Sequence, residues 1–177
     1  MSYEEEVLEF RRQKDEFFKN HPESPLTPEQ KKDFKGLKYF PVNEKYRFIV
    51  KIKENKRKPI VHIATNTGIV QEYIKFGKIQ FEIDGMPCQL TVFKDPENDY
   101  YFIPFMDLTS GEETYGSGRY IDIHPTGNPG EFILDFNFAY NPYCAYNDNW
   151  VCPITPRENR LPCRIEAGEK KFREGEH

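Results

Sequence analysis

The chain has 177 residues, a length that suits one domain with its own hydrophobic core, and we expect residues 1–177 to form a single domain. Hydrophobic residues make up only 37% of the chain but aromatic residues reach 15%, so phenylalanine and tyrosine must supply much of the buried area. The net charge of −4, without a basic stripe, argues against nucleic acid as a partner, and no apolar run is long enough to span a membrane.

Two N-terminal helices are predicted within residues 1–36. A capping-box pattern begins at Ser2, and apolar residues then recur at helical spacing as far as residue 20. A second capping box begins at Thr27, is followed by proline, and starts a short helix that ends by Gly36. The acidic N-terminus lacks the apolar segment of a secretory signal, so we expect a cytoplasmic protein.

The spacing of apolar residues changes to a period of two across residues 39–168, where we expect a β core with long loops. The expected strands lie at residues 46–52, 59–64, 71–76, 79–83, 88–92, 100–105, 119–123, 132–138 and 164–167. Asp84-Gly85 is the strongest hairpin signal, and the basic stretch 51–59 is expected to form a solvated hairpin turn. About eight or nine short strands with turns between them predict a mainly β fold, an antiparallel sandwich or barrel with N-terminal α-helices.

Two loops are too long and too polar to be simple connections. The first is FMDLTSGEETYGSGRY at residues 105–120, and the second begins with DFNFAYNPYCAYNDNWVC at residues 135–152 and continues into CPITPRENRLP. Loops carried by a rigid β scaffold are the usual place for a binding or catalytic site. We therefore expect a polar, aromatic-lined pocket at one end of the β core.

Arg119 is the most informative residue of the first loop. Strand alternation puts it on the same face as Ile121 and Ile123, so its side chain is expected to point into the core. A buried guanidinium needs a carboxylate or a bound anion. The sequence leaves two alternatives open, an ion pair with Asp107 or Glu169 and a contact with a ligand.

The strand at residues 132–138 has two chemically distinct faces. Period-two geometry puts its aromatic and leucine side chains toward the core and Asp135 and Asn137 on the opposite face. The core-facing set is Phe132, Leu134, Phe136 and Phe138. The asparagines of this region, including Asn141, could either satisfy the backbone of turns or line a pocket.

The cysteines suggest no zinc site, because Cys144 and Cys152 lack the close spacing of a zinc knuckle. We expect these two to lie close in space without zinc, either as inert buried thiols or as a nucleophilic or redox thiol. Cys88 and Cys163 fall in strand patterns and are expected in the core. In a cytoplasmic protein the four thiols would be reduced, metal-bound or catalytic rather than joined in disulfides.

Several motifs together resemble the domain-of-unknown-function 1684 family. They are F-x-D-x-T-S-G-x-E-T-Y-G-x-G-R-Y, L-D-F-N-x-A-Y-N-P, C-A-Y, C-P, P-x-E-N-R-L-P and A-G-E-K, and they cover roughly residues 70–170. Tyr143 stands where the family pattern has proline, and Cys163 where it usually has an aliphatic residue, whereas Cys144 and Cys152 match. The resemblance implies membership and the location of a site, in a family of bacteria and archaea without an established activity, and it implies no reaction.

The leading hypothesis is that the loops at residues 105–119 and 137–160 bind a small polar or anionic molecule, with Arg119 as its anchor. The ligand-binding candidates are Thr109, Tyr115, Arg119, Asn137, Tyr140, Asn141, Cys152, Asn159 and Glu169. The alternative is a hydrolase or transferase in which Asp107 or Asp135 is the general base and Cys144 the nucleophile. A third hypothesis is a structural or partner-binding module. The sequence identifies no cofactor and no oligomeric state.

Overall fold

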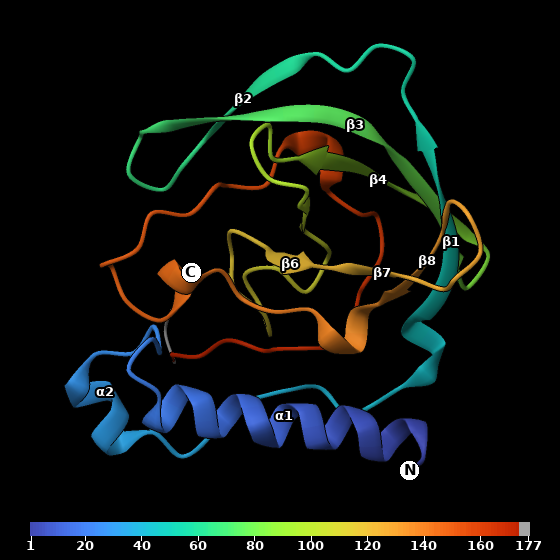
Figure 1. Cartoon of the computed structure of the whole chain (residues 1–177). Helices are drawn as coiled ribbons and strands as arrows, with labels where there is room; N and C mark the ends of the chain where they lie inside the picture. Colours follow the sequence, from blue (N-terminus) through green and yellow to red (C-terminus); the bar gives the residue numbers. More distant parts are fainter. Residues whose placement is uncertain (174–177) are drawn as a thin grey trace.

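The structure, a computed structural model, describes residues 1–173 and consists of an antiparallel sheet wrapped into a nearly closed barrel, with helix α1 beneath it in the view of Figure 1. The helices are α1 (Tyr3–Asn20) and α2 (Pro28–Asp33). The strands are β1 (Arg47–Glu54), β2 (Ile60–Ala64), β3 (Val70–Ile83), β4 (Met86–Lys94), β5 (Tyr101–Phe105), β6 (Arg119–Ile121), β7 (Ile123–Pro125) and β8 (Glu131–Asp135). The expected mainly β class is confirmed, as a barrel rather than a sandwich.

The barrel closes through one kinked stretch of chain. The hydrogen-bonded strand order is β6-β5-β4-β3-β1-β8-β7, and its two end strands are consecutive in the sequence, separated only by Asp122. The single strand expected at residues 119–123 is therefore split in two, one half paired with β5 and the other with β8. Splitting this strand lets the two edges of the sheet meet, which removes most of its exposed edge.

Local sequence explains the longest hairpin. Asp84 and Gly85 form the two-residue turn between β3 and β4, and both have positive φ, at 51° and 79°. A type I′ hairpin turn requires positive φ at both of its central residues. The two strands expected at residues 71–76 and 79–83 are one continuous strand, β3, with a shift in register between Lys75 and Gly77. This bulge bends β3 around the barrel.

Two other expectations about this part of the chain were wrong. The basic stretch 51–59 is no hairpin turn, because β1 and β2 follow one another along the same edge of β3, with Glu54 opposite Gly77 and Ile60 opposite Ile74. Residues 164–167 are no strand. Their backbone is held by side chains instead, since the carbonyls of Ile165 and Ala167 accept hydrogen bonds from a buried arginine.

The strand expected at residues 132–138 ends early. Phe132, Leu134 and Phe136 do pack in the core, as strand alternation predicted. After Asp135 the chain turns into a short 3-10 helix, which reverses the alternation, and Phe138 packs outside the barrel against Phe10 of α1, with ring centroids 5.0 Å apart. The prediction that Phe138 faces the core was therefore wrong.

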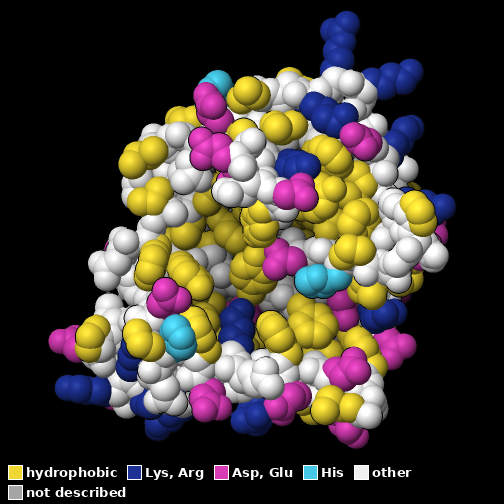
Figure 2. Space-filling view, viewed as in Figure 1, with side chains coloured by type: hydrophobic (Ala, Val, Ile, Leu, Met, Phe, Trp, Pro, Cys, Tyr) yellow, Lys and Arg dark blue, Asp and Glu magenta, His cyan; other side chains and the backbone are white. Residues whose placement is uncertain are grey.

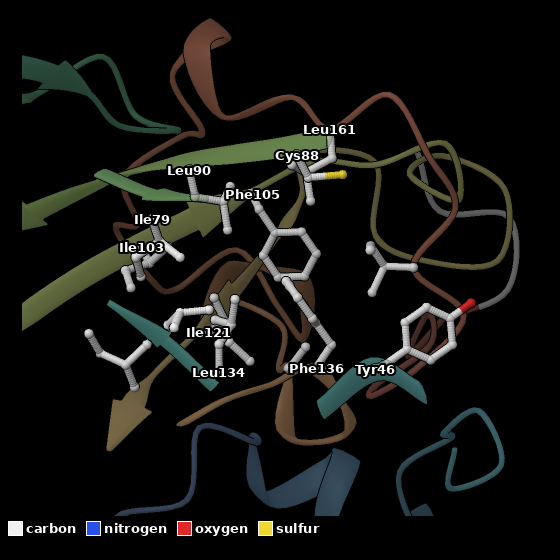
Figure 3. Close-up of a cluster of buried hydrophobic side chains, with 14 of the residues drawn as sticks. Tyr46, Ile79, Cys88, Leu90, Ile103, Phe105, Ile121, Leu134, Phe136 and Leu161 are labelled. Atoms are coloured by element: carbon white, nitrogen blue, oxygen red, sulfur yellow. The ribbon is translucent and has the colours of Figure 1, made fainter. Parts of the chain in front are cut away.

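The core lies inside the barrel and is strongly aromatic. Figure 3 shows Phe105 and Phe136 in the middle of it, surrounded by aliphatic side chains of the other strands, and their ring centroids are 5.2 Å apart. A second, smaller cluster of buried side chains lies at the helices, where the ring of Phe18 from α1 packs edge to face against the ring of Tyr146. No helix among residues 1–173 combines the length and the apolar character needed to cross a membrane.

Candidate functional site

A groove runs between α1 and the outer wall of the barrel, and we call it the α1 groove. It has an outer compartment of about 530 Å³ and an inner one of about 370 Å³. The outer compartment is lined by Tyr3, Glu6, Glu44, Arg47, His124, Ile133, Asp135 and Phe138, and the inner one by Phe10, Lys14, Phe18, Asp122, His124, Asp135, Phe138, Tyr140, Asn141 and Tyr143. Figure 2 shows this face hollowed between helix and barrel, with acidic and histidine side chains beside hydrophobic ones.

Strand alternation explains the barrel side of the groove. Ile121 and Ile123 point into the core, so Asp122 and His124 between and beyond them point out toward α1. His124 pairs across the strands with Ile133, and Asp135 lies two residues further along β8 on the same outward face. The imidazole of His124 makes no hydrogen bond or ion pair with any other residue of the described part of the chain.

Asp135 holds the start of α1 on the barrel. Its carboxylate accepts hydrogen bonds from the Tyr3 hydroxyl at 2.6 Å, from the Asn137 backbone N–H at 3.0 Å and from the Asn137 side chain at 2.9 Å. Burial, together with the neighbouring Asp135 carboxylate, raises the pKa of Tyr3 well above its usual range. The Asn137 side chain also donates to the Asn43 carbonyl at 2.8 Å. Together, Asp135 and Asn137 therefore join three segments of the chain: the start of α1, the segment at Asn43 and the end of β8.

Asp122 and Tyr140 form the polar edge of the inner compartment. The Tyr140 hydroxyl donates to Asp122 Oδ1 at 3.0 Å and lies 3.4 Å from the Tyr100 hydroxyl. The pKa of Tyr140 is raised, first by burial and then by Tyr100 and Asp122, so its phenol keeps its proton. This edge presents carboxylate and hydroxyl oxygens.

Glu169 lies behind the inner compartment and is almost completely buried. Its carboxylate accepts from Lys14 Nζ at 2.6 Å, from the Tyr146 hydroxyl at 2.6 Å and from the Asn141 backbone N–H at 3.3 Å. Burial and this carboxylate raise the pKa of Tyr146 far above its usual range. Glu169 thus has three donors within the protein, positions Lys14 and Asn141, and lines neither compartment of the α1 groove.

Arg119 lies inside the barrel wall and is only 1% exposed, as the sequence predicted. The structure shows the ion-pair alternative, with Arg119 Nη2 3.5 Å from Asp107 Oδ1 and the two Nη atoms donating to the carbonyls of Ile165, Ala167 and Glu169. Gly118 is needed beside it, because a Cβ there would lie 2.5 Å from the Phe105 carbonyl oxygen. Arg119 lines neither compartment of the α1 groove.

The other candidates of the first loop and of the segment near residue 159 also bind within the protein. Thr109 donates to Asp107 at 2.8 Å, and Asp107 also accepts from the Ile165 backbone N–H at 2.6 Å. Asn159 accepts from the Thr91 backbone N–H at 2.7 Å and donates to two backbone carbonyls. These contacts hold the long loops against the strands.

The remaining candidates form a thiol cluster. Cys144 N–H donates to Cys152 Sγ at 3.3 Å, and the Tyr115 hydroxyl lies 3.6 Å from Cys144 Sγ. The two cysteines are therefore close in space, as expected. Asp107, Asp135 and Cys144, the catalytic candidates, have no hydrogen-bond partner in common among the described residues.

Sequence reasoning missed several groove residues, among them Lys14, Asp122 and His124. Two signals could have revealed them. Strand alternation already placed Asp122 on the face of the strand that points away from the core, unlike Arg119. Phe10, Lys14 and Phe18 are spaced four residues apart and therefore lie along one face of α1. Within residues 1–173, no group of three or more His, Cys, Asp or Glu side chains is arranged to hold a metal ion.

Comparisons with known proteins agree with the motifs. Residues 32–170 match the model of a family described as protein of unknown function (DUF1684). The chain is also similar to an uncharacterized protein of Haloarcula marismortui whose structure was determined in solution by NMR, with 34% sequence identity and a TM-score of 0.74. That similarity covers 97% of this chain and 96% of the other. No protein of curated function matches the chain.

Proposed function

The chain belongs to the DUF1684 family, as its motifs indicated, and because the family description gives no function, we propose one from geometry: the α1 groove binds a small polar molecule that carries hydrogen-bond donors. The inner compartment, at about 370 Å³, is within the range of small-molecule sites. The proposal keeps the polar ligand expected from the sequence and moves its site from the Arg119 loop to the space between α1 and the barrel.

Asn141 carries the proposal. It is 1% exposed, it lines the inner compartment, and its Oδ1 atom has no hydrogen-bond partner among the described residues. The orientation of the amide is fixed, because its Nδ2 atom donates to the Lys170 carbonyl at 3.1 Å and an oxygen in that place would be repelled. A buried acceptor without a donor costs roughly 1–3 kcal/mol, so a ligand that supplies a donor here gains affinity.

The charges of the groove favour a neutral or cationic ligand over an anion. Glu6, Glu44, Asp122 and Asp135 line it, whereas its basic residues are Lys14 and Arg47. Lys14 is already neutralised by the buried Glu169 carboxylate. The lining therefore offers more acceptors than donors, which suits amines and hydroxyl groups.

Aromatic rings supply the apolar part of the site. Phe10 and Tyr143 line the inner compartment although both are exposed, and Phe138 is turned toward the same space by the 3-10 helix that ends β8. Exposed rings beside carboxylates can stack on the carbon skeleton of a sugar-like ligand or on an ammonium group.

The proposal is tested by melting the protein in the presence of primary amines, amino sugars, polyols and nucleosides, with phosphate and small carboxylic acids as the anionic comparison. We expect a donor-bearing class to raise the Tm of the wild type. In Asn141→Leu and Asp122→Asn the affinity for the same compound should fall about tenfold, since each loses one acceptor. Isothermal titration measures the change.

Asp99→Asn is the matched control for Asp122→Asn, because Asp99 is an exposed aspartate outside the groove. It should leave binding unchanged. The proposal is wrong if only anions stabilise the wild type, if no compound of the panel does, or if NMR chemical-shift changes caused by the bound compound lie away from the groove.

A further inference from the structure

Cys144 and Cys152 differ from the other two cysteines of the protein, Cys88 and Cys163, in the groups that surround their sulfur atoms. Neither is in a disulfide, and they are 8% and 7% exposed. The backbone N–H of Cys144 donates to Cys152 Sγ at 3.3 Å, and the backbone N–H of Tyr143 also contributes to lowering the pKa of Cys152. Donors aimed at one sulfur stabilise its thiolate form, as they do in reactive cysteines.

The two thiols are therefore unequal. Hydrogen bonds from the Cys144 thiol and from these backbone N–H groups lower the pKa of Cys152, although burial opposes them. The pKa of Cys144 is raised, because its thiol donates to Cys152 and because it is buried. One sulfur favours the thiolate while its neighbour keeps a proton.

The chain contains a second close pair with the opposite surroundings. Cys88 Sγ and Cys163 Sγ are 3.7 Å apart, but the Cys88 thiol also lies 3.6 Å from the Met86 carbonyl, which it can only donate to. Within residues 1–173 no backbone N–H donates to either sulfur, and burial raises the pKa of both thiols, that of Cys163 to about 12. Both pairs bring two cysteines into contact, and they differ in the donors and acceptors that surround the sulfur atoms.

We propose that Cys144 and Cys152 are a thiol pair that a hydroperoxide oxidises to a disulfide, with Cys152 as the attacking thiol and Cys144 as the resolving thiol. The site is independent of ligand binding in the α1 groove. A small oxidant suits the slight exposure of the two cysteines, and the exposed residues Tyr143 and Val151 are their neighbours in the sequence.

The reaction has two steps. The Cys152 thiolate attacks one peroxide oxygen, an S–O bond forms, the O–O bond breaks, and the leaving hydroxide takes up a proton to give water. Cys144 then attacks the sulfenic sulfur of Cys152, the S–S bond forms, the S–O bond breaks, and a second water leaves with the proton of Cys144. Two electrons pass from the sulfurs to the peroxide.

The test uses the whole reduced protein and a limiting amount of hydrogen peroxide, followed by alkylation, trypsin digestion and mass spectrometry. Residues 120–157 form one tryptic peptide that contains both Cys144 and Cys152, whereas Cys88 and Cys163 fall in separate peptides. In the peptide 120–157 a disulfide blocks alkylation of both cysteines and lowers the peptide mass by two hydrogens. We expect this disulfide to form about tenfold faster than a cross-link between Cys88 and Cys163. A thiol reductant should restore alkylation of both cysteines.

Two variants separate the roles of the sulfurs. In Cys144→Ser, which lacks the resolving thiol, a dimedone adduct should accumulate on Cys152. In Cys152→Ser, Cys144 should stay reduced under the same conditions. The proposal is overturned if the Cys88–Cys163 pair oxidises first in the wild type, a result that depends on no variant, or if Cys144 of the Cys152→Ser protein reacts as fast as before.

Discussion

The guanidinium of Arg119 joins two parts of the chain that lack regular pairing with each other. Its three backbone acceptors lie in residues 165–169, which form no strand, and its carboxylate partner Asp107 lies at the start of the first long loop. Burial lowers the pKa of Arg119 and Asp107 opposes this, so the charge is retained inside the protein. At this residue the family motif G-x-G-R-Y has a structural role.

Replacing Arg119 with lysine should lower the free energy of unfolding by about 3 kcal/mol. Lysine keeps the charge but has no planar fork, so it cannot satisfy Asp107 and three carbonyls together. Urea denaturation followed by circular dichroism measures the loss. Arg12→Lys, on the exposed face of α1, should change stability by less than about 0.5 kcal/mol. Equal stabilities for the two variants would contradict the structural role of Arg119.

Helix α1 connects the fold to the candidate site, because one face of it is packed and the adjoining face forms a wall of the groove. Arg11 donates to the Phe40 and Asn137 carbonyls at 2.9 and 3.3 Å, and Phe18 is buried against Tyr146. Phe10, by contrast, is 45% exposed along the groove. The helix is thus anchored by some side chains and leaves others available for a ligand.

This division predicts unequal effects of two equivalent truncations. Phe18→Ala should cost about 3–5 kcal/mol, the usual range for a buried aromatic side chain, because Phe18 is only 2% exposed. Phe10→Ala should cost about 1 kcal/mol and instead weaken binding of any ligand found for the groove. Thermal unfolding compares the two variants. If Phe10→Ala is as destabilising as Phe18→Ala, the groove is a packed interface and no ligand site.

Across residues 1–173, the burial of tyrosine side chains is a recurring electrostatic feature. Burial is the first cause of a raised pKa for several buried or half-buried tyrosines, and for Tyr73 the pKa rises to about 12. Among them are Tyr3, Tyr39, Tyr73, Tyr120, Tyr140 and Tyr146. A chain with so many aromatic residues and a modest hydrophobic content must bury phenols to build its core.

These raised pKa values predict a loss of stability in alkali. Below about pH 10 the folded and unfolded chains both keep their phenol protons, so this contribution is fully present. Above about pH 10 the unfolded chain releases protons that the folded chain retains, and stability falls as the pH rises toward the folded pKa values. Tyrosinate absorbance should therefore lag behind that of free tyrosine and then rise together with unfolding. Smooth ionisation of all tyrosines near pH 10 in a folded protein would refute this.

The sequence alone determined the elements whose cause is local. The side chain of Ser2 accepts from the Glu5 backbone N–H, the full capping box at Thr27 starts α2, and Asp84-Gly85 turns β3 into β4, all as the sequence indicated. Period-two alternation also gave the correct faces of Arg119 and of most of the strand before residue 136. Backbone dihedral preferences and side-chain periodicity act over a few residues, so they can be read directly from the chain.

The tertiary structure decided which of these elements meet, and with that the site. Tyr3 and Asp135 are 132 positions apart in the chain, and the sequence patterns at the two positions do not indicate that they share a hydrogen bond. Whether Arg119 would find Asp107 or a ligand, and that Cys88 would lie beside Cys163, likewise depended on how the barrel closes. Local patterns fix the faces of helices and strands, but contacts between faces depend on the free energy of packing the whole chain, which is a sum over many distant pairs.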